Sequence, residues 1–236
     1  MTQYPPYQSW KLTQVSLSLE QDEAQLPEVV AQILKVQQSA ILNLKIIRRG
    51  VDARRKRRIL RVYTIAFDLP LDVSVPAHLQ NSGTLQALNK AQDAGYHYVR
   101  PCSSKHIVVA GMGPSGLFAA LELAHSGHSV ILLERGAPVE ERVRDVENFW
   151  SGCALNPQSN VQFGEGGAGT FSDGKLTTRI KHPLAARVLE TFVACGAAED
   201  ILIDAKPHIG TDVLRTILVN LRSELRSLGV EIRYHS

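Results

Sequence analysis

Hydrophobic and polar positions in the first part of the chain predict alternating strands and a helix. Residues 13–19 alternate apolar and polar side chains, which is typical of a half-buried strand. Apolar residues between 24 and 38 recur at helical spacing and predict an amphipathic helix. Two further apolar runs, 41–47 and 58–69, predict a second and a third strand. Helical spacing over 84–94 and a short run at 96–99 predict a second helix and a fourth strand.

This order, βαββαβ, is that of a ferredoxin-like α+β small domain with both helices on one face of an antiparallel sheet. The polar, proline-containing sequence RPCSSK at 100–105 predicts a linker. We therefore expect a small domain over 1–100 and a second domain over 105–236.

The second part of the chain predicts an α/β domain with a parallel sheet. Apolar runs at 107–110 and 130–133 read as buried strands, with a helix between them that Gly127 closes. Helices are predicted over 136–150, 183–195 and 213–228, and short strands over 201–203 and 230–234. Strands that alternate with helices indicate a Rossmann-like fold.

Composition narrows the class of protein. The chain has 236 residues, 44% hydrophobic and 21% charged, as expected of a globular protein. Its net charge of +3 is too small to imply a nucleic-acid partner by itself. No apolar stretch is long enough to cross a bilayer, and the N-terminus lacks the order of a signal peptide. Cys102, Cys153 and Cys195 are widely spaced, which favours reduced thiols in a cytoplasmic protein and no metal site.

Basic residues crowd one predicted hairpin. They are Arg48, Arg49, Arg54, Arg55, Lys56, Arg57, Arg58 and Arg61. The patch either binds phosphate groups, on RNA or on a nucleotide, or is a solvated hairpin that protects an edge strand. The solvated hairpin is favoured, because no aromatic residues for base stacking are interleaved with the charges. A nucleic-acid partner stays an alternative.

The strongest chemical signal is a G-x-G-x-x-G fingerprint after the 107–110 strand. Its glycines are Gly111, Gly113 and Gly116, with Pro114 and Ser115 between the last two. The glycines permit a tight turn, close approach of a pyrophosphate and close packing of helix on strand, and the helix N-terminus attracts phosphate. Glu134 ends the next strand, where it would accept hydrogen bonds from ribose hydroxyls and repel a 2′-phosphate. These residues predict a site for FAD or NAD.

A second glycine-rich stretch runs from residue 156 to residue 179. Its glycines are Gly164, Gly166, Gly167, Gly169 and Gly174. Glycine loses much entropy on folding, so this composition favours close approach of backbone to a flat ligand over a mobile surface loop. The flanking side chains suit an active-site wall: Phe163, Phe171, Asp173, Lys175 and Arg179.

Charged residues near these motifs are further candidates. Arg135, Arg142 and Arg144 could contact a cofactor's phosphates, although exposed arginines paired with neighbouring acids explain the last two equally well. His208 could act as an acid–base group but is more simply a structural or exposed histidine.

Lys175 or Arg179 could stabilise negative charge on a reduced flavin. The residues alone assign no catalytic group, and they leave substrate, electron acceptor and oligomeric state open.

Four segments together resemble a known family. They are VAGMGPSGLFAALELAHSGHSVILLERG, RVRDVENFW, SNVQFGEGGAGTFSDGKLTTR and KPHIGTD. They resemble the bacterial FAD-dependent dehydrogenase family, flavoproteins with two dinucleotide-binding domains. The resemblance implies FAD and hydride transfer at flavin N5 with a small-molecule substrate or electron acceptor.

The resemblance also implies roles for individual residues. Gly111, Gly113, Ser115 and Gly116 would hold the pyrophosphate, Glu134 the adenosine ribose with Arg135 beside it, and the segment from Gly164 to Gly169 would lie along the flavin. Members of the family are much longer than this chain, so we expect an N-terminal fragment whose FAD-binding domain is incomplete. The alternatives are an NAD-binding dehydrogenase, a nucleic-acid-associated protein acting through the hairpin at 48–61, and an inactive fragment.

Overall fold

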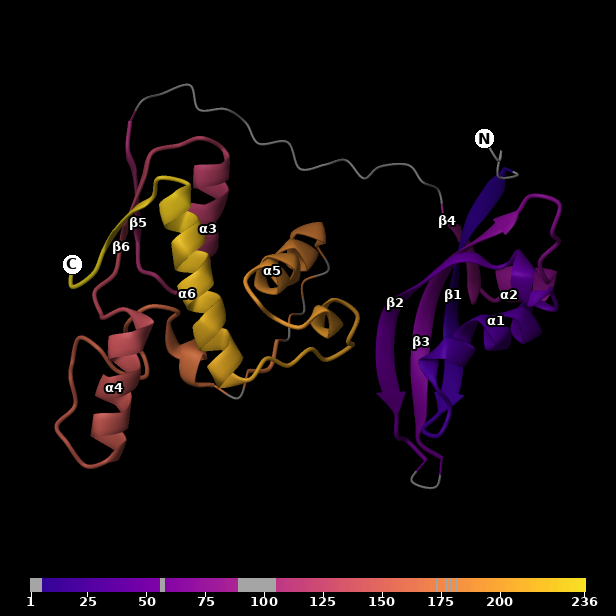
Figure 1. The fold of residues 1–236 in the computed structure, drawn as a ribbon, viewed down its shortest axis with the longest axis horizontal. Helices are drawn as coiled ribbons and strands as arrows, with labels where there is room; N and C mark the ends of the chain where they lie inside the picture. The colour runs from indigo at the N-terminus through magenta and orange to yellow at the C-terminus, as the bar shows by residue number, and fades with distance from the viewer. Residues whose placement is uncertain are drawn as a thin grey trace. The chain divides into compact units, whose positions relative to one another are not determined.

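The computed structural model describes residues 6–55, 58–88, 105–172, 174–176, 178, 180 and 182–236. The chain is mixed α/β, with one antiparallel and one parallel sheet (Figure 1). It divides into two compact units, Met1–Gly95 with Ile203–Ala205, and Tyr96–Leu202 with Lys206–Ser236.

Over its described residues, the first unit has a four-stranded antiparallel sheet, two α-helices and two 3₁₀-helices. Its strands are β1 (Tyr7–Ser18), β2 (Leu42–Asp52), β3 (Leu60–Pro70) and β4 (Leu85–Leu88), in the order β2-β3-β1-β4. Its helical elements are η1 (Glu23–Gln25), α1 (Leu26–Leu34), η2 (Gln38–Ala40) and α2 (Ala77–Asn81). Figure 1 shows α1 and α2 on the same side of this sheet.

Periodicity explains how α1 covers the sheet. Leu26, Val30 and Leu34 are spaced four residues apart, so they form one apolar stripe, and all three are buried. They pack in one cluster with strand residues such as Leu12 and Phe67. Burying a leucine side chain contributes about 2 kcal/mol, so this stripe fixes the helix to that face.

The predicted helix over 84–94 is wrong where the structure describes it. Residues Leu85–Leu88 form β4, and the short helix α2 comes earlier, at Ala77–Asn81. Gly83 reverses the chain after α2 with a φ of +72°, and Leu85 then pairs with Leu12 of β1 and is buried. Strand pairing thus overrides the helical spacing. The predicted strand at 96–99 and most of the linker lie outside the described residues.

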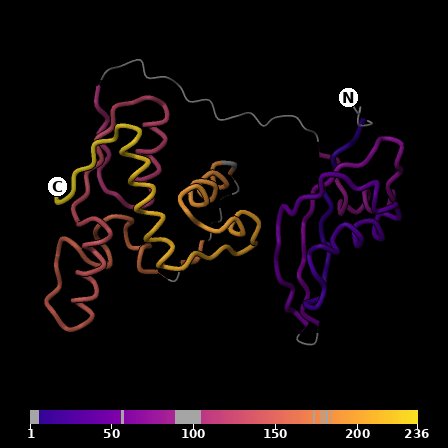
Figure 2. Tube along the Cα trace, in the orientation of Figure 1, coloured from indigo at the N-terminus to yellow at the C-terminus, as the bar shows by residue number. Residues whose placement is uncertain are grey.

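The second unit is built on a parallel sheet in the order β5-β6-β7. Its strands are β5 (Ile107–Ala110), β6 (Val130–Leu133) and β7 (Glu231–Arg233). Its helical elements are α3 (Pro114–His125), α4 (Val139–Trp150), η3 (Ala168–Phe171), α5 (Pro183–Ala194), η4 (Glu199–Leu202) and α6 (Thr211–Ser227). Helices α3 and α6 are neighbours (Figure 2). They share one apolar core with the strands. None of the helices described in the chain is both long and apolar enough to cross a membrane.

The predicted strand at 201–203 is also wrong, because residues Glu199–Leu202 form the 3₁₀-helix η4. Ile201 is the buried residue of this turn and anchors it. Backbone pairing begins just after the turn, where Ile203 O accepts from Arg49 N–H of β2 and Ala205 N–H donates to Arg49 O, both at 2.7 Å. The other predicted elements within the described residues are present, and β5 and β6 have the predicted bounds. The first two strands are longer than predicted: β1 begins at Tyr7 and not at residue 13, and β2 ends at Asp52 and not at residue 47.

Tyr63 gives the first unit a predicted alkaline transition. Its buried hydroxyl donates to Glu23 Oε1 at 2.9 Å, and burial followed by this hydrogen bond raises the pKa of Tyr63 to about 12. The unfolded tyrosine ionises near pH 10, so the stabilisation is complete below about pH 10 and is lost between about pH 10 and 12. We expect Tyr63→Phe to remove this part of the pH dependence. The free energy of unfolding of the first unit is measured by urea denaturation, followed by Trp10 fluorescence in a Trp150→Phe background. If the Tyr63 protein and Tyr63→Phe lost the same stability over this pH range, the assignment would be contradicted.

Candidate functional site

The glycine fingerprint forms a tight turn between β5 and α3. Gly111 has a φ of +93°, and its N–H donates to Leu133 O at 2.7 Å. Helix α3 begins at Pro114, and Gly113 at its N-cap provides no capping side chain. A Cβ on Gly116 would lie 1.9 Å from Gly111 O, so only glycine lets the helix pack this closely on the turn. The N-terminus of a twelve-residue helix therefore begins at bare backbone.

Glu134 lies buried beside this turn. Its Oε2 accepts from Met112 N–H and its Oε1 from Gly136 N–H, both at 2.7 Å. The carboxylate thus joins the fingerprint turn to the segment after β6. A carboxylate has about four acceptor positions, so this one retains capacity for two hydroxyl donors.

The second glycine-rich stretch lies directly against the fingerprint turn. Gly166 N–H donates to Met112 O at 2.8 Å, and a Cβ on Gly167 would lie 3.3 Å from Gly113 Cα. The N–H groups of residues 165, 166 and 167 donate to Ala137 O, Met112 O and Gly164 O. These N–H groups are therefore used within the protein and are not available to a ligand. A molecule beside this segment would contact the glycine Cα atoms.

Together these segments enclose a cavity of about 480 Å³. It is lined by Ala110, Gly111, Met112, Gly113, Leu133, Glu134, Arg135, Gln162, Phe163, Gly164, Gly167 and Ser236. Six of the predicted cofactor contacts line it: Gly111, Gly113, Glu134, Arg135, Gly164 and Gly167. A volume of this size accommodates a small organic ligand.

An aromatic and cationic pair forms one wall of the cavity. The Arg135 guanidinium carbon lies 3.5 Å from the centroid of the half-exposed Phe163 ring. Such stacking is worth about 0.5–1 kcal/mol at an exposed site. The stacking fixes the flat guanidinium group of Arg135 at the edge of the cavity. The two residues come from different segments, one after β6 and one in the second glycine-rich stretch.

Arg142 does not have the position that a phosphate contact requires. It is fully buried, and its guanidinium donates to Asn160 O at 2.8 Å, Val161 O at 2.9 Å and Glu165 O at 2.6 Å. It also donates to Thr170 Oγ1 at 3.1 Å. Burial lowers the pKa of Arg142 to about 10. We therefore correct the predicted phosphate contact: this side chain holds the glycine-rich segment against α4.

A second buried group anchors the same segment from α6. Glu165 Oε2 accepts from Val139 N–H and from Arg222 Nη1, both at 2.7 Å, and Arg222 also binds Glu140. Burial raises the pKa of the Glu165 carboxyl, whereas the bond to Glu140 raises the pKa of Arg222. The pairing offsets the cost of burying the charges, so its removal would leave an uncompensated charge inside the unit.

A further cavity of about 460 Å³ borders the first turn of α3. Its lining is largely apolar and includes Pro114, Ser115, Gly166, Gly169, Phe118, Phe192, Leu218 and Lys175. Gly169 borders open space, because a Cβ added there would meet no atom within 4 Å. Consecutive residues, Gly113 and Pro114, therefore line two separate cavities.

Several candidate residues are not part of the first cavity. Arg144 is exposed on α4, and His208 is exposed in a backbone bridge with Lys175. Asp173 and Arg179 lie outside the described residues. Within the described part of the chain no group of three or more metal-binding side chains occurs.

The sequence contained a signal for the buried arginines that the motifs did not reveal. Arg142 follows Val139 by three residues and precedes Val146 by four, so it lies on the apolar face of α4. Arg222 follows Leu218 by four residues on the apolar face of α6. A cation on an apolar stripe indicates an internal partner.

Comparison with known proteins gives one long match and several short ones. A family model described as a domain of unknown function, DUF8436, matches residues 10–68, which span most of β1 to β3. An uncharacterized protein of Clostridium beijerinckii is 37% identical over 235 residues, or 96% of this chain. The chain spans 42% of the length of that relative.

Two Arabidopsis thaliana proteins match short segments. Flavin-containing monooxygenase FMO GS-OX-like 2 is 51% identical over 39 residues, and flavin-containing monooxygenase FMO GS-OX2 is 57% identical over 35 residues. These matches cover 16% and 15% of this chain and 8% of each plant protein.

Proposed function

We propose that this chain is the nucleotide-binding part of an FAD-dependent oxidoreductase. One observation carries the proposal: the bare Gly113 backbone at the N-terminus of α3 faces a cavity that Glu134 also lines. The nearest atom to a Cβ on Gly113 would be Gly167 Cα at 4.0 Å, so the space beside this glycine is open. A phosphate at this point would meet helix N–H groups and no side chain.

The two cavities suggest how an extended dinucleotide would be held. Its pyrophosphate would lie at the first turn of α3, beside Gly113 and Ser115. Glu134 would accept from the ribose hydroxyls, with the Arg135–Phe163 pair against the adenosine. Gly166 and Gly169 would border the flavin in the second, largely apolar cavity. Gly164 and Gly167 line the first cavity, where they would lie beside the nucleotide.

Bound FAD would supply hydride transfer at flavin N5, and the protein would bind and orient it. Glu134 and the helix N-terminus would fix the nucleotide end. Lys175 lines the second cavity, where its ammonium group would stabilise negative charge. The apolar lining would exclude water from that end of the site.

The architecture and the relatives support this assignment. The strand order β2-β3-β1-β4 agrees with a ferredoxin-like first unit, and the β5–turn–α3–β6 unit agrees with a Rossmann-like second unit. The short matches are to proteins named flavin-containing monooxygenases. The described cysteines, Cys153 and Cys195, are free thiols, in keeping with the proposed cytoplasmic location. Because the chain spans 42% of its clostridial relative, the catalysed reaction is proposed for the whole protein.

The predicted effect of Gly113→Ala tests the site. The substitution has room, and a φ of −76° suits alanine, but its methyl group would occupy the path of the pyrophosphate. We expect the variant to fold normally and to bind FAD at least about tenfold more weakly, since it loses close contact at the helix N-terminus. The purified chain is incubated with FAD and desalted, and protein-bound flavin is read from bands near about 370 and 450 nm, which the cofactor itself provides.

Gly210→Ala is the matched control. It also adds one methyl group at a helix start, where the nearest atom is the flexible carboxylate of Asp212. It should retain FAD as the unmodified chain does. If the unmodified chain stays colourless but binds NAD in a calorimetric titration, the NAD-dependent alternative is correct. If Gly113→Ala retains as much FAD as the unmodified chain, the fingerprint is not part of the FAD site.

A further inference from the structure

One face of the first unit's sheet carries a row of basic and polar side chains. Lys45 of β2 pairs with Ala66 of β3, which pairs with Lys11 of β1, which pairs with Gln86 of β4. Residues directly opposite one another in a sheet point to the same face, so the two lysines share it and lie about 10 Å apart across β3. The helices of this unit pack on the other face, through the cluster that includes Leu12.

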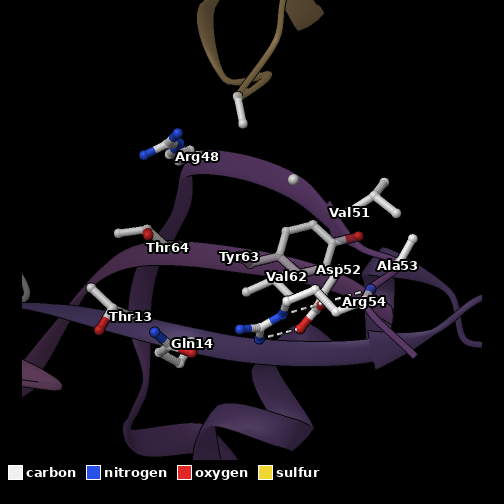
Figure 3. A pocket seen from close by; sticks show the side chains of 12 residues that line it. Thr13, Gln14, Arg48, Val51, Asp52, Ala53, Arg54, Val62, Tyr63 and Thr64 are labelled. Carbon is white, nitrogen blue, oxygen red and sulfur yellow. Dashed lines mark hydrogen bonds and ion pairs between the residues drawn. The ribbon is translucent and has the colours of Figure 1, made fainter. Parts of the chain in front are cut away.

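An arginine and a surface hollow lie next to these lysines on the same face of the sheet. Arg48 pairs with Thr64, which lies two residues from Ala66 and therefore points to the same side. A hollow of about 400 Å³ lies here, with Thr13, Gln14 and Thr64 along it and Arg48 and Arg54 at its edges (Figure 3). The hollow thus combines hydroxyl and amide groups with guanidinium groups.

Three irregularities in strand register shape this face. The pairing of β1 with β3 shifts between Leu12 and Val15, and the pairing of β2 with β3 shifts between Leu42 and Lys45 and between Ile46 and Arg48. Gln14, within the first irregularity, has a φ of +66°, which is uncommon for a residue other than glycine. Bulges redirect side chains and are frequent beside functional sites.

The charges of this face are not balanced within the described residues. Lys11, Lys45 and Arg48 have no carboxylate partner there. The two acidic residues of the face are already bonded, Asp52 to Arg54 at 2.6 Å and the buried Asp68 to Asn43 at 2.9 Å.

The structure therefore changes the composition of the basic patch expected from the sequence. Three arginines of that patch bind groups within the protein: Arg49 pairs with Glu23 at 3.4 Å, Arg54 pairs with Asp52, and Arg61 donates to Gln21 O. Lys11 and Lys45, which lie outside the predicted hairpin patch, join Arg48 on the sheet. Lys11, Lys45 and Arg48 thus form a basic surface that spans three neighbouring strands, β1, β3 and β2.

We infer that this sheet face binds the phosphodiester backbone of a single-stranded nucleic acid. Three cations without carboxylate partners among the described residues attract phosphates, and Thr13, Gln14 and Thr64 offer hydrogen bonds to phosphate or sugar oxygens. The groups named here address phosphate and sugar oxygens, which carry no sequence information. Binding is therefore insensitive to base sequence and steeply dependent on salt. The inference is independent of the flavin site.

The experiment measures fluorescence anisotropy of labelled 20-nucleotide RNA and DNA with the full 236-residue chain at several salt concentrations. We expect similar affinity for the RNA and the DNA oligonucleotide. Each phosphate contact contributes roughly −0.7 to the slope of log K against log salt concentration, so three contacts give a slope of about −2 or steeper. The triple variant Lys11→Gln/Lys45→Gln/Arg48→Gln should bind roughly tenfold or more weakly, with a slope shallower by about 2.

The matched control Lys35→Gln/Lys206→Gln/Arg226→Gln also lowers the formal net charge by three, from +3 to 0, and should bind as the unmodified chain does. The circular dichroism spectra of both variants report their folding, and the single variant Arg48→Gln gives a second measure if the triple variant unfolds. No RNA binding at low salt, equal weakening by the control, or displacement of RNA by millimolar ADP would overturn the inference. Binding to phosphatidylserine vesicles without binding to RNA would assign the face to a membrane surface instead.

Discussion

Gly116→Ala is expected to unfold the second unit or to destabilise it by about 3 kcal/mol or more, since overpacking a rigid contact is costly. A Cβ at this position would lie 1.9 Å from Gly111 O and 3.0 Å from Gly111 C. Both atoms are backbone within the fingerprint turn, so no side chain can move aside. Urea denaturation followed by Trp150 fluorescence in a Trp10→Phe background measures the second unit alone, because the chain has two tryptophans, one in each unit.

Gly113→Ala is the matched control within the same motif. Its Cβ would have no neighbour closer than 4.0 Å, so its free energy of unfolding should stay within about 0.5–1 kcal/mol of the unmodified chain. The pair of variants separates the two roles of the fingerprint: Gly116 for packing and Gly113 for the ligand. If Gly116→Ala retained full stability, the close packing of α3 on the turn would be wrong.

Arg142→Met is expected to destabilise the second unit by about 3–5 kcal/mol, the range for removing one partner from a buried charged network. Methionine fills a similar volume but donates no hydrogen bond, so the carbonyls of Asn160 and Val161 would lose the arginine donor, and Glu165 O would keep only the long bond of 3.4 Å from Thr170 Oγ1. The segment that lines the first cavity would then lose its anchor. The same urea titration measures the loss, and limited proteolysis over 156–172 shows whether the segment opens.

Arg144→Met provides the control on the same helix. Arg144 is exposed, so its replacement should change the free energy of unfolding by less than about 0.5 kcal/mol. Arg142→Lys should recover only part of the stability, because one ammonium group cannot reach carbonyls on several sides. Destabilisation of similar size by the Arg142 and Arg144 variants would contradict the assigned role.

The glycine-rich segment owes much of its composition to the protein's own packing. A Cβ on Gly166 would lie 2.4 Å from Leu218 Cδ1, one on Gly174 1.6 Å from Ile209 O, and one on Gly136 2.5 Å from Gly164 Cα. Gly169 alone among the glycines of this stretch has open space at its Cβ position. Substitutions at Gly166 and Gly174 therefore report on folding, whereas Gly169→Ala would report on a ligand.

Local patterns were sufficient for much of the fold. The bounds of β5 and β6, the position of α3 and the turn at Gly111 follow from short apolar runs, helical spacing and glycine chemistry, all of which act over a few residues. Pairing with distant strands is not written in a local window. For this reason residues 84–88 resembled a helix, although Leu85 is buried opposite Leu12, more than seventy residues away.

The features of the candidate site also fall into two groups, those that the sequence determines and those that depend on the tertiary structure. The sequence by itself determined that a glycine turn, a helix N-terminus and Glu134 would follow one another along the chain, because each depends on its neighbours in sequence. Only the tertiary structure decided that Gly166 would bond to Met112 O, that Arg135 would stack on Phe163, and which carbonyls Arg142 would bind. It also decided that Lys11 and Lys45 would share one sheet face with Arg48. Those contacts join segments whose separation in sequence carries no information about their distance in space, and burial and strand register alone determine them.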